Sequence, residues 1–347
     1  MMIGSLSISS VTMALDGNKT KEVNKEMSRY KDIVELWKGF GIESSADLES
    51  HLENFSILFA YNSGAIENRE ITYHDTREIF ESGKVSGYSG NLKTLFEISN
   101  MKDAYRLMLK WFDEKTPLSL ESIKEMHYQI AKLTYDQRRW ELGERPGQFK
   151  KDDRWGVGRH DIAAPVEEVE ANLQEDLDEI NSYAGSKPLV AAAFFHARFE
   201  GVHAFADGNG RCGRALMNYY LITHDHPPVV VYEEDKSQYY KALDEYDETG
   251  DLSPLIGFLE AQAEKTWLPT LERYEHSKGE PDLVVSAKNR KHSLSDYLDQ
   301  ADGIGIDALM EQLAEPSDVR TNALELGKDN PAILPVNGFC KQMKMVM

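Results

Sequence analysis

The stretch from Val190 to Glu200 carries apolar side chains on almost every side of a helix. A helix of that kind has no polar face to offer to water, so it is expected at the centre of a helical core. It leads into the loop 203–214, where Gly208 and Gly210 predict a tight turn before the next helix. No alternation of strand and helix surrounds these residues, and the sequence therefore predicts a mainly α fold.

Apolar residues at helical spacing predict further helices on both sides of this segment. A helical pattern begins near Lys31, and the clearest later helices cover residues 92–112, 119–133, 165–180, 215–221, 237–246 and 253–271. The stretch 146–165 contains three glycines and no helical period, and we expect a small β-hairpin there. The domains we expect are a flexible N-terminus (1–30), an N-terminal helical region (31–110), a core domain (111–275) and a partly disordered C-terminal extension (276–347).

The composition argues against several classes of partner. The formal net charge is −20, whereas proteins that bind nucleic acid carry an excess of Lys and Arg for the phosphates. No stretch has the run of about 18 apolar residues that a membrane helix needs, and the N-terminus lacks the basic region of a secretory signal. Cys212 and Cys340 lie far apart and are expected to be free thiols. We therefore expect a cytoplasmic protein with no nucleic-acid or membrane partner.

The loop 203–214 combines residues that suit a polyphosphate. A tight turn that feeds a helix exposes backbone N–H groups at the helix N-terminus, and these favour phosphate. Arg211 and Arg214 are three residues apart at the start of that helix and can pair with phosphate oxygens. Asp207 offers a hard carboxylate for Mg²⁺ beside the phosphates, and His203 can take a proton from an incoming hydroxyl.

Two other interpretations of this loop stay open. Residues 208–213 match G-x-G-x-x-G, the dinucleotide-binding fingerprint. That motif follows a β-strand, however, whereas residues 190–200 have the pattern of a helix. The other interpretation is a plain helix–turn–helix with surface charges, which would bring His, Asp, Asn and two Arg together by chance.

The loop resembles the motif of the Fic family, H-x-F-x-[DE]-G-N-G-R-x-x-R, at every fixed position. The resemblance implies a helical Fic core with a small β-hairpin flap, and an enzyme that transfers AMP from ATP to a Ser, Thr or Tyr hydroxyl of a protein. It makes His203 the general base and Asp207 the Mg²⁺ ligand. The residues that it assigns to the phosphates of ATP are Gly208, Asn209, Gly210, Arg211 and Arg214.

The similarity extends beyond the loop, over roughly residues 55–267. Residues 147–165 look like the family's flap, a hairpin that holds a target peptide by strand addition. Tyr240 matches a tyrosine that borders the adenine in relatives, although an ordinary core tyrosine is the other interpretation. Asp247 stands where relatives carry asparagine, which leaves the base preference open. Ala204 stands where the family often has proline, and we expect this departure to cost rigidity rather than chemistry.

Residues 63–68 are similar to the family's inhibitory motif, [ST]-x-x-x-E-[GN], with Ser63 and Glu67 at its fixed positions. The resemblance implies that Glu67 pairs with Arg214 and occupies the site of the ATP γ-phosphate. ATP would then bind with its α-phosphate out of line for attack. The other interpretation of Glu67 is a solvated charge near a helix end.

Three functions follow from the resemblance and stay open. They are AMP transfer inhibited by Glu67, removal of AMP from a modified protein, and a regulatory module that binds targets with little turnover. ATP and Mg²⁺ are the implied ligands, and a target protein is the implied partner at the flap. Self-modification and a homodimer are also left open. His224 and His226 lie in a proline-bounded loop and are interpreted as surface residues rather than a metal site.

Overall fold

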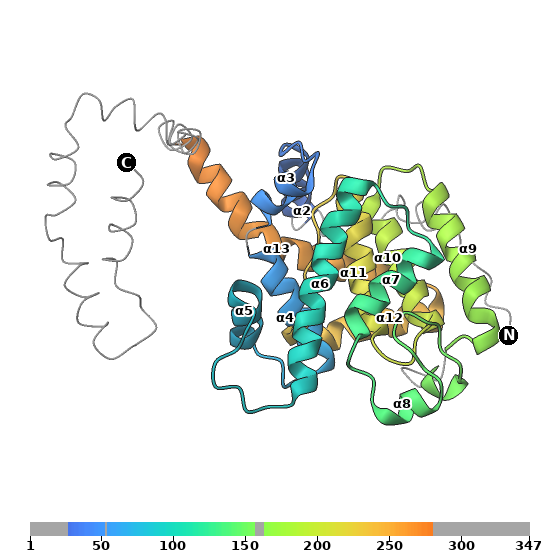
Figure 1. The fold of residues 1–347 in the computed structure, drawn as a ribbon. Helices are drawn as coiled ribbons and strands as arrows, with labels where there is room; N and C mark the ends of the chain where they lie inside the picture. Colours follow the sequence, from blue (N-terminus) through green and yellow to red (C-terminus); the bar gives the residue numbers. More distant parts are fainter. Residues whose placement is uncertain (1–26, 53, 157–162, 280–347) are drawn as a thin grey trace, which may run out of the picture. The chain divides into compact units, whose positions relative to one another are not determined.

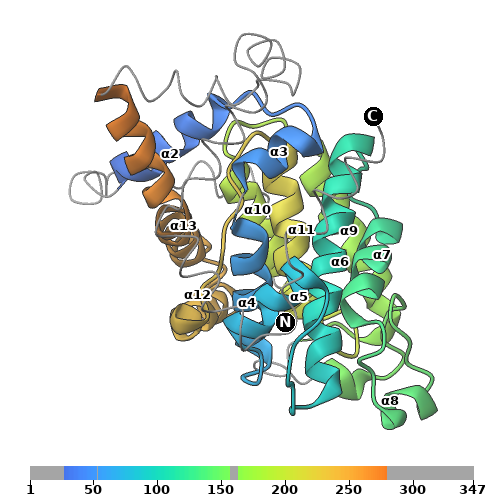
Figure 2. The same cartoon turned by 60° about the vertical axis from the view of Figure 1, so that its left-hand side comes forward.

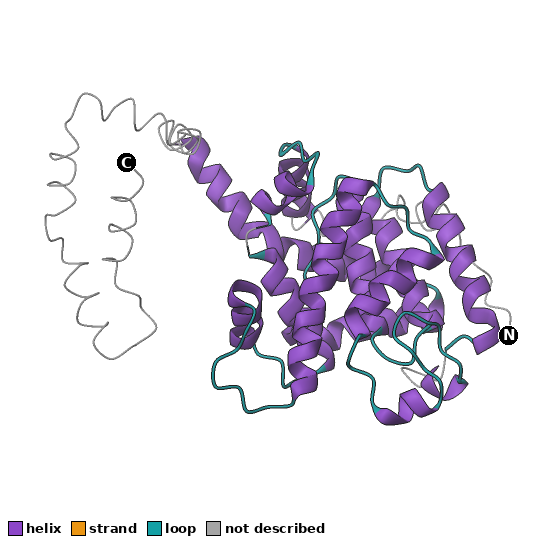
Figure 3. Ribbon diagram, viewed as in Figure 1, coloured by secondary structure: helices purple, strands orange, loops and turns teal. Residues whose placement is uncertain are grey.

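The computed structural model describes residues 27–52, 54–156 and 163–279. Most of these residues form helices, which confirms the predicted mainly α fold (Figure 3). Contacts divide the chain into a first compact unit that ends at Tyr274 and a second unit, Glu275–Met347. Of the second unit the structure describes only residues 275–279, which continue a helix. None of the helices in the described ranges is long and apolar enough to cross a membrane.

Two helices form the centre of the first unit, α10 (Pro188–Val202) and α11 (Asn209–Thr223). They pack against each other, α9 (Val169–Ser182) packs on α10, and α7 (Leu120–Ala131) packs on α11 (Figure 1). Every residue of α10 from Leu189 to Ala197 is buried, as its apolar pattern predicts. The catalytic-loop candidate joins α10 to α11, so its two ends are held by the most buried helices of the unit.

Five of the described helices lie before residue 115, and two of them pack on α11. The five are α2 (Met27–Lys38), α3 (Ser45–His51), α4 (Phe55–Glu67), α5 (Tyr73–Ser82) and α6 (Leu92–Glu114). Both α4 and α6 pack on α11, and α4 also contacts α6 (Figure 2). The predicted inhibitory motif, residues 63–68, lies at the C-terminal end of α4, so this packing brings it to the beginning of α11.

Shorter elements complete the described part. They are α8 (Gln137–Glu141), η2 (Asp153–Gly156), η3 (Val166–Glu168), η4 (Glu233–Asp235), α12 (Lys236–Thr249) and α13 (Ser253–Gly279). Serine caps explain where two of the helices begin: the side chain of Ser44 caps α3 and that of Ser119 caps α7, each in a capping box.

Several predictions about elements need correction. The described residues contain no strand, and the start of the predicted hairpin forms the 3₁₀ turn η2; its middle, 157–162, lies outside the described residues, so the flap hairpin is not confirmed. The helices α5 and α8 were not predicted, because both are short and largely polar. The helix α11 begins at Asn209, earlier than predicted, since its first turn consists of polar loop residues without an apolar period.

The histidines after α11 differ in their surroundings. His224 is exposed, as predicted, whereas His226 is 1 % exposed, so its interpretation as a surface residue is wrong. The phenol of Tyr30 lies 2.6 Å from Nε2 of His226, and this contact between α2 and the loop after α11 could not be read from local sequence. The two predicted terminal segments, 1–30 and 276–347, lie almost wholly outside the described residues. The predicted domain boundary at residue 110 stays a prediction.

Candidate active site

A cavity of about 370 Å³ lies where the loop 203–208 meets the beginning of α11. The structure brings almost every predicted site residue to its wall. The predicted residues that line it are Glu67, His203, Asp207, Gly208, Asn209, Gly210, Arg211, Arg214 and Tyr240. Ser63 does not line it but contacts Arg214 from behind. The cavity is therefore formed jointly by the predicted loop and the predicted inhibitory motif.

His203 ends α10 in the left-handed conformation, with φ 48° and ψ 58°. A left-handed residue turns the chain sharply, so the imidazole stands at the wall of the cavity instead of continuing along the helix. Burial, and then the positive charge of Lys150, lowers the pKa of His203 below its usual 6.5. The ring is therefore neutral near pH 7, which is the state that a general base requires.

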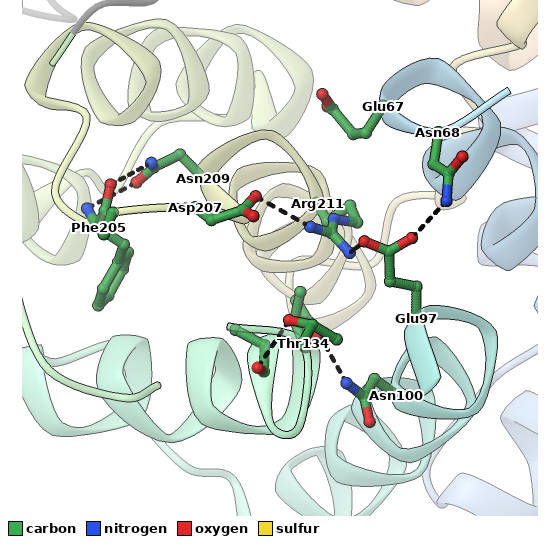
Figure 4. Close-up of polar contacts among 12 residues, drawn as sticks. Glu67, Asn68, Glu97, Asn100, Thr134, Phe205, Asp207, Asn209 and Arg211 are labelled. Atoms are coloured by element: carbon green, nitrogen blue, oxygen red, sulfur yellow. Dashed lines mark hydrogen bonds and ion pairs between the residues drawn. The ribbon is translucent and has the colours of Figure 1, made fainter. Parts of the chain in front are cut away.

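The turn after His203 is held by one side chain. Asn209 accepts a hydrogen bond from the Phe205 backbone N–H (2.9 Å) and donates one to the Phe205 carbonyl (2.8 Å) (Figure 4). Gly208 adopts φ 86°, which completes the turn and begins α11. The side chain of Asn209 is thus engaged within the loop, and its part in phosphate binding stays a prediction. Asn209 lines the cavity and belongs to the first turn of α11, whose N–H groups have no i−4 carbonyl.

Asp207 lies among three cations. Its carboxylate oxygens are 3.3 Å from Arg211, 3.5 Å from Arg139 and 3.9 Å from Lys93. Burial alone would raise the pKa of Asp207, but these cations outweigh it and hold the pKa below its usual value. The carboxylate is therefore ionised and faces the cavity.

Arg211 is part of a row of polar side chains from α6 and α4. Its guanidinium lies 3.5 Å from the carboxylate of Glu97, which is only 3 % exposed. Asn68, the last position of the inhibitory motif, donates a hydrogen bond of 2.7 Å to the other oxygen of Glu97. Figure 4 shows Asn68, Glu97, Arg211 and Asp207 linked in this order. The sequence predicted Arg211 as a phosphate ligand and gave no sign of its link to the inhibitory motif.

Arg214 turns toward α4 instead. Its Nη2 donates to Oε1 of Glu67 (2.8 Å) and to the Ser63 carbonyl (2.9 Å), and its Nε donates to the Ser63 hydroxyl (3.0 Å). Arg214 is 1 % exposed, whereas the Glu67 side chain is 35 % exposed. Although burial works in the opposite direction, Tyr239, Glu67 and Glu200 raise the pKa of Arg214, so it stays charged. The ion pair implied by the inhibitory motif is thus present in the structure.

Gly210 makes the approach of this glutamate possible. A Cβ at Gly210 would collide with the Glu67 carboxylate and lie 2.9 Å from the Arg214 guanidinium. The carboxylate therefore lies directly against the first turn of α11, where the exposed N–H groups and the guanidinium attract a negative charge.

Several residues of the site could not be found from the sequence. Lys93 and Glu97 belong to α6 and Arg139 to α8, and each is far from the loop along the chain. The i,i+4 spacing of Lys93 and Glu97, and the place of Arg139 near the start of a helix, are typical of any surface helix and do not indicate a site. Tyr240 and Asp247 line the cavity from α12. That Tyr240 borders the adenine stays a prediction, and the base preference stays open.

No cluster of three or more His, Cys, Asp or Glu that could hold a metal ion occurs in the residues the structure describes. A cation at this site would therefore depend on Asp207 and on oxygens of a bound substrate. Mg²⁺ commonly binds in this way, through one or two carboxylates plus substrate phosphates.

Comparisons with known proteins agree with this geometry. The sequence model described as "Fic/DOC family" matches residues 117–221. Protein adenylyltransferase fic-1 of Caenorhabditis elegans is 28 % identical over 244 residues, which cover 67 % of this chain and 44 % of that protein. Protein adenylyltransferase Fic of Drosophila willistoni is 29 % identical over 212 residues, 59 % of this chain and 40 % of that protein. The chain thus spans less than half the length of these curated relatives.

Solved structures share the fold. A Fic-domain-containing signaling protein from Bacteroides thetaiotaomicron superposes with a TM-score of 0.60 at 25 % identity, over 70 % of this chain and 96 % of that chain. Fic-1 from C. elegans superposes with a TM-score of 0.57 at 25 % identity, over 74 % of this chain and 73 % of that chain. The matched region contains α7, α9, α10, the loop and most of α11. Residues 117–221 are therefore similar in sequence to the Fic/DOC family, and the chain shares the fold of solved Fic-domain structures.

Proposed function

We propose that the protein transfers AMP from ATP to a Ser, Thr or Tyr hydroxyl of a target protein, and that Glu67 inhibits this transfer. The observation that carries the proposal is the convergence in one cavity of a neutral histidine, an ionised aspartate and a buried arginine bonded to a glutamate. Relatives named protein adenylyltransferase support the same reaction.

The residues of the chain have separate tasks in this reaction. His203 takes the proton of the target hydroxyl while the hydroxyl oxygen bonds to the α-phosphorus of ATP and pyrophosphate leaves. The N–H groups of the first turn of α11, together with Arg214, stabilise the negative charge of the phosphates. Arg211 lies between Asp207 and Glu97 and keeps the Asp207 carboxylate in place. Residues 147–165 are the proposed docking segment for the target.

Asp207 fits a Mg²⁺ ligand, because it is an ionised carboxylate on the wall of a cavity that suits phosphates. Bound Mg²⁺ would offset the charge of the triphosphate. Asp207→Ala and EDTA are each expected to lower transfer by about 10²-fold or more, since a metal ion contributes several kcal/mol of charge stabilisation. The measurement is the transfer rate of the native protein and of Asp207→Ala, each with Mg²⁺ and with EDTA. EDTA should add little to the effect of the substitution; full activity in EDTA would remove the metal from the proposal.

One observation favours a second candidate, removal of AMP from a modified protein. Glu67 bonds Arg214 through one oxygen and is still 35 % exposed at the cavity wall, where a carboxylate can position an attacking water. In that reaction Glu67 would be required, whereas in transfer it would be inhibitory. The effect of removing Glu67 therefore has opposite signs for the two functions.

The test compares native protein with Glu67→Gly on labelled ATP, Mg²⁺ and a cell lysate, and in parallel on AMP-modified protein from the first reaction. We expect weak labelling by native protein and strong labelling by Glu67→Gly, including labelling of the protein itself. Loss of label that requires native Glu67 would assign the hydrolase instead. If the protein shows neither reaction but still binds its target, the result would assign a regulatory module.

A further inference from the structure

His127 lies behind the loop and takes no part in the chemistry proposed above. It belongs to α7 and is fully buried. Its ring stacks face to face on Phe205, with the ring centroids 3.6 Å apart and the planes at 3°. Phe205 is a fixed position of the loop motif and is itself fully buried. The imidazole therefore packs against the loop through the side chain of Phe205.

Both ring nitrogens of His127 are hydrogen-bonded, and the partners determine its protonation. Nε2 lies 2.8 Å from the backbone carbonyl of Asp207, which can only accept, so Nε2 carries the hydrogen. The backbone N–H of Gly147 donates to Nδ1 at 2.9 Å, so Nδ1 carries none. Burial lowers the pKa of His127 to about 4, in agreement with a neutral ring.

These two bonds join parts of the site with different tasks. The side chain of Asp207 is the proposed Mg²⁺ ligand. Gly147 is the first residue of the proposed docking segment and adopts φ 80°. A second bond lies close by, from the Lys150 N–H to the Ala204 carbonyl at 2.9 Å. Gly147, through His127, and Lys150, directly, are thus tied to loop residues on the two sides of Phe205.

We propose that His127 is a positioning residue, which holds the loop 203–208 and the root of the docking segment, residues 147–150, in a fixed relation. The target hydroxyl, the base His203 and the carboxylate of Asp207 must meet in one geometry, and a misplacement of about 1 Å can cost 10²-fold in rate. A neutral imidazole suits this task, because one small ring donates to one segment and accepts from the other. This part of the inference rests on the proposed function, whereas the mechanical link does not.

The test begins with His127→Phe, which keeps the ring stack on Phe205 and removes both hydrogen bonds. The matched control is His226→Phe: His226 is equally buried, has both ring nitrogens in hydrogen bonds, and its pKa is also lowered to about 4, but it lies outside the cavity. Made in the Glu67→Gly protein, His127→Phe should lower kcat by about 10²-fold. His226→Phe should leave kcat unchanged at a temperature where both proteins are folded.

Two readouts decide the inference even if the Glu67→Gly protein transfers no AMP. Amide hydrogen exchange in His127→Phe should become roughly tenfold faster in both 147–150 and 203–210, as expected for two lost hydrogen bonds, and should be unchanged there in His226→Phe. The ¹⁵N spectrum of the parent should show His127 protonated on Nε2 alone.

A pair of smaller changes covers the case in which His127→Phe does not fold. His127→Gln can reach the Asp207 carbonyl with a donor, whereas His127→Asn can reach only the Gly147 N–H with an acceptor. The Gln variant should therefore keep more activity and more protection in 203–210 than the Asn variant. Unchanged exchange in both segments, or equal losses in the Gln and Asn variants, would overturn the proposal.

Discussion

Replacement of His203 by alanine is expected to lower AMP transfer by about 10²–10⁴-fold, the usual contribution of a positioned general base. The reason is its neutral, half-buried ring at the wall of the cavity, beside the turn that carries Asp207. Binding of ATP should change little, because no phosphate contact is assigned to His203. The measurement is the transfer rate of the Glu67→Gly protein with and without the substitution, together with its affinity for ATP.

The backbone at His203 requires a second variant. Its φ of 48° is unfavourable for alanine, so His203→Ala could disturb the loop as well as remove the base. Asparagine tolerates this conformation better and offers no comparable base. Equal losses in His203→Ala and His203→Asn would therefore show that the base is what matters. Transfer at the parent rate by either variant would rule out the role.

The pH dependence gives an independent check of the same residue. Burial and Lys150 lower the pKa of His203, so the neutral base persists to a lower pH than it would in a free imidazole. The rate is expected to fall with decreasing pH at a midpoint below 6.5, as the ring becomes protonated. Lys150→Met should move that midpoint upward. A midpoint that stays in place would mean that Lys150 does not act on His203.

The sequence predicts those parts of the site whose pattern lies within one continuous segment, and misses those that depend on contacts between distant segments. The centre of the fold was predictable because α10 is apolar on every side, which requires no knowledge of its neighbours. The loop was predictable because its residues are contiguous and their spacing sets a turn at a helix N-terminus. Glu67 came from a family resemblance, and the contact with Arg214 required the packing of α4 on α11.

The remaining site residues depend on tertiary contacts that leave no local pattern. Glu97 reads as one of many acidic positions on a surface helix until α6 packs on α11 and buries it beside Arg211. His127 reads as one position in an amphipathic helix, and its two bonding partners lie far from it along the chain. The side-chain bonds of Asn209 to the Phe205 backbone are local, yet no sequence pattern predicted them.

The contact between Glu67 and Arg214 predicts the other large effect under the proposed function: Glu67→Gly should raise AMP transfer by about 10–100-fold. A hydrogen bond to a charged group contributes about 1.5–3 kcal/mol, and about 1.4 kcal/mol corresponds to a factor of ten. The Glu67 carboxylate holds the buried Arg214 guanidinium at 2.8 Å and lies against Gly210. In the proposed function, ATP and Glu67 would compete for one guanidinium and one helix N-terminus. Removing the acid lets the triphosphate settle with its α-phosphorus in line with the hydroxyl.

The measurement is the mass shift of +AMP on native protein, Glu67→Gly and the double variant Glu67→Gly/Arg214→Ala. The double variant should lose the gain, because the guanidinium that Glu67 releases is then missing. Asp176→Asn is the matched control: it removes the carboxylate charge from another Arg–carboxylate pair, to Arg198 at 2.7 Å, outside the cavity, and should leave transfer unchanged. Native activity that already equals Glu67→Gly, or a double variant that keeps the gain, would show that Glu67 does not inhibit through Arg214.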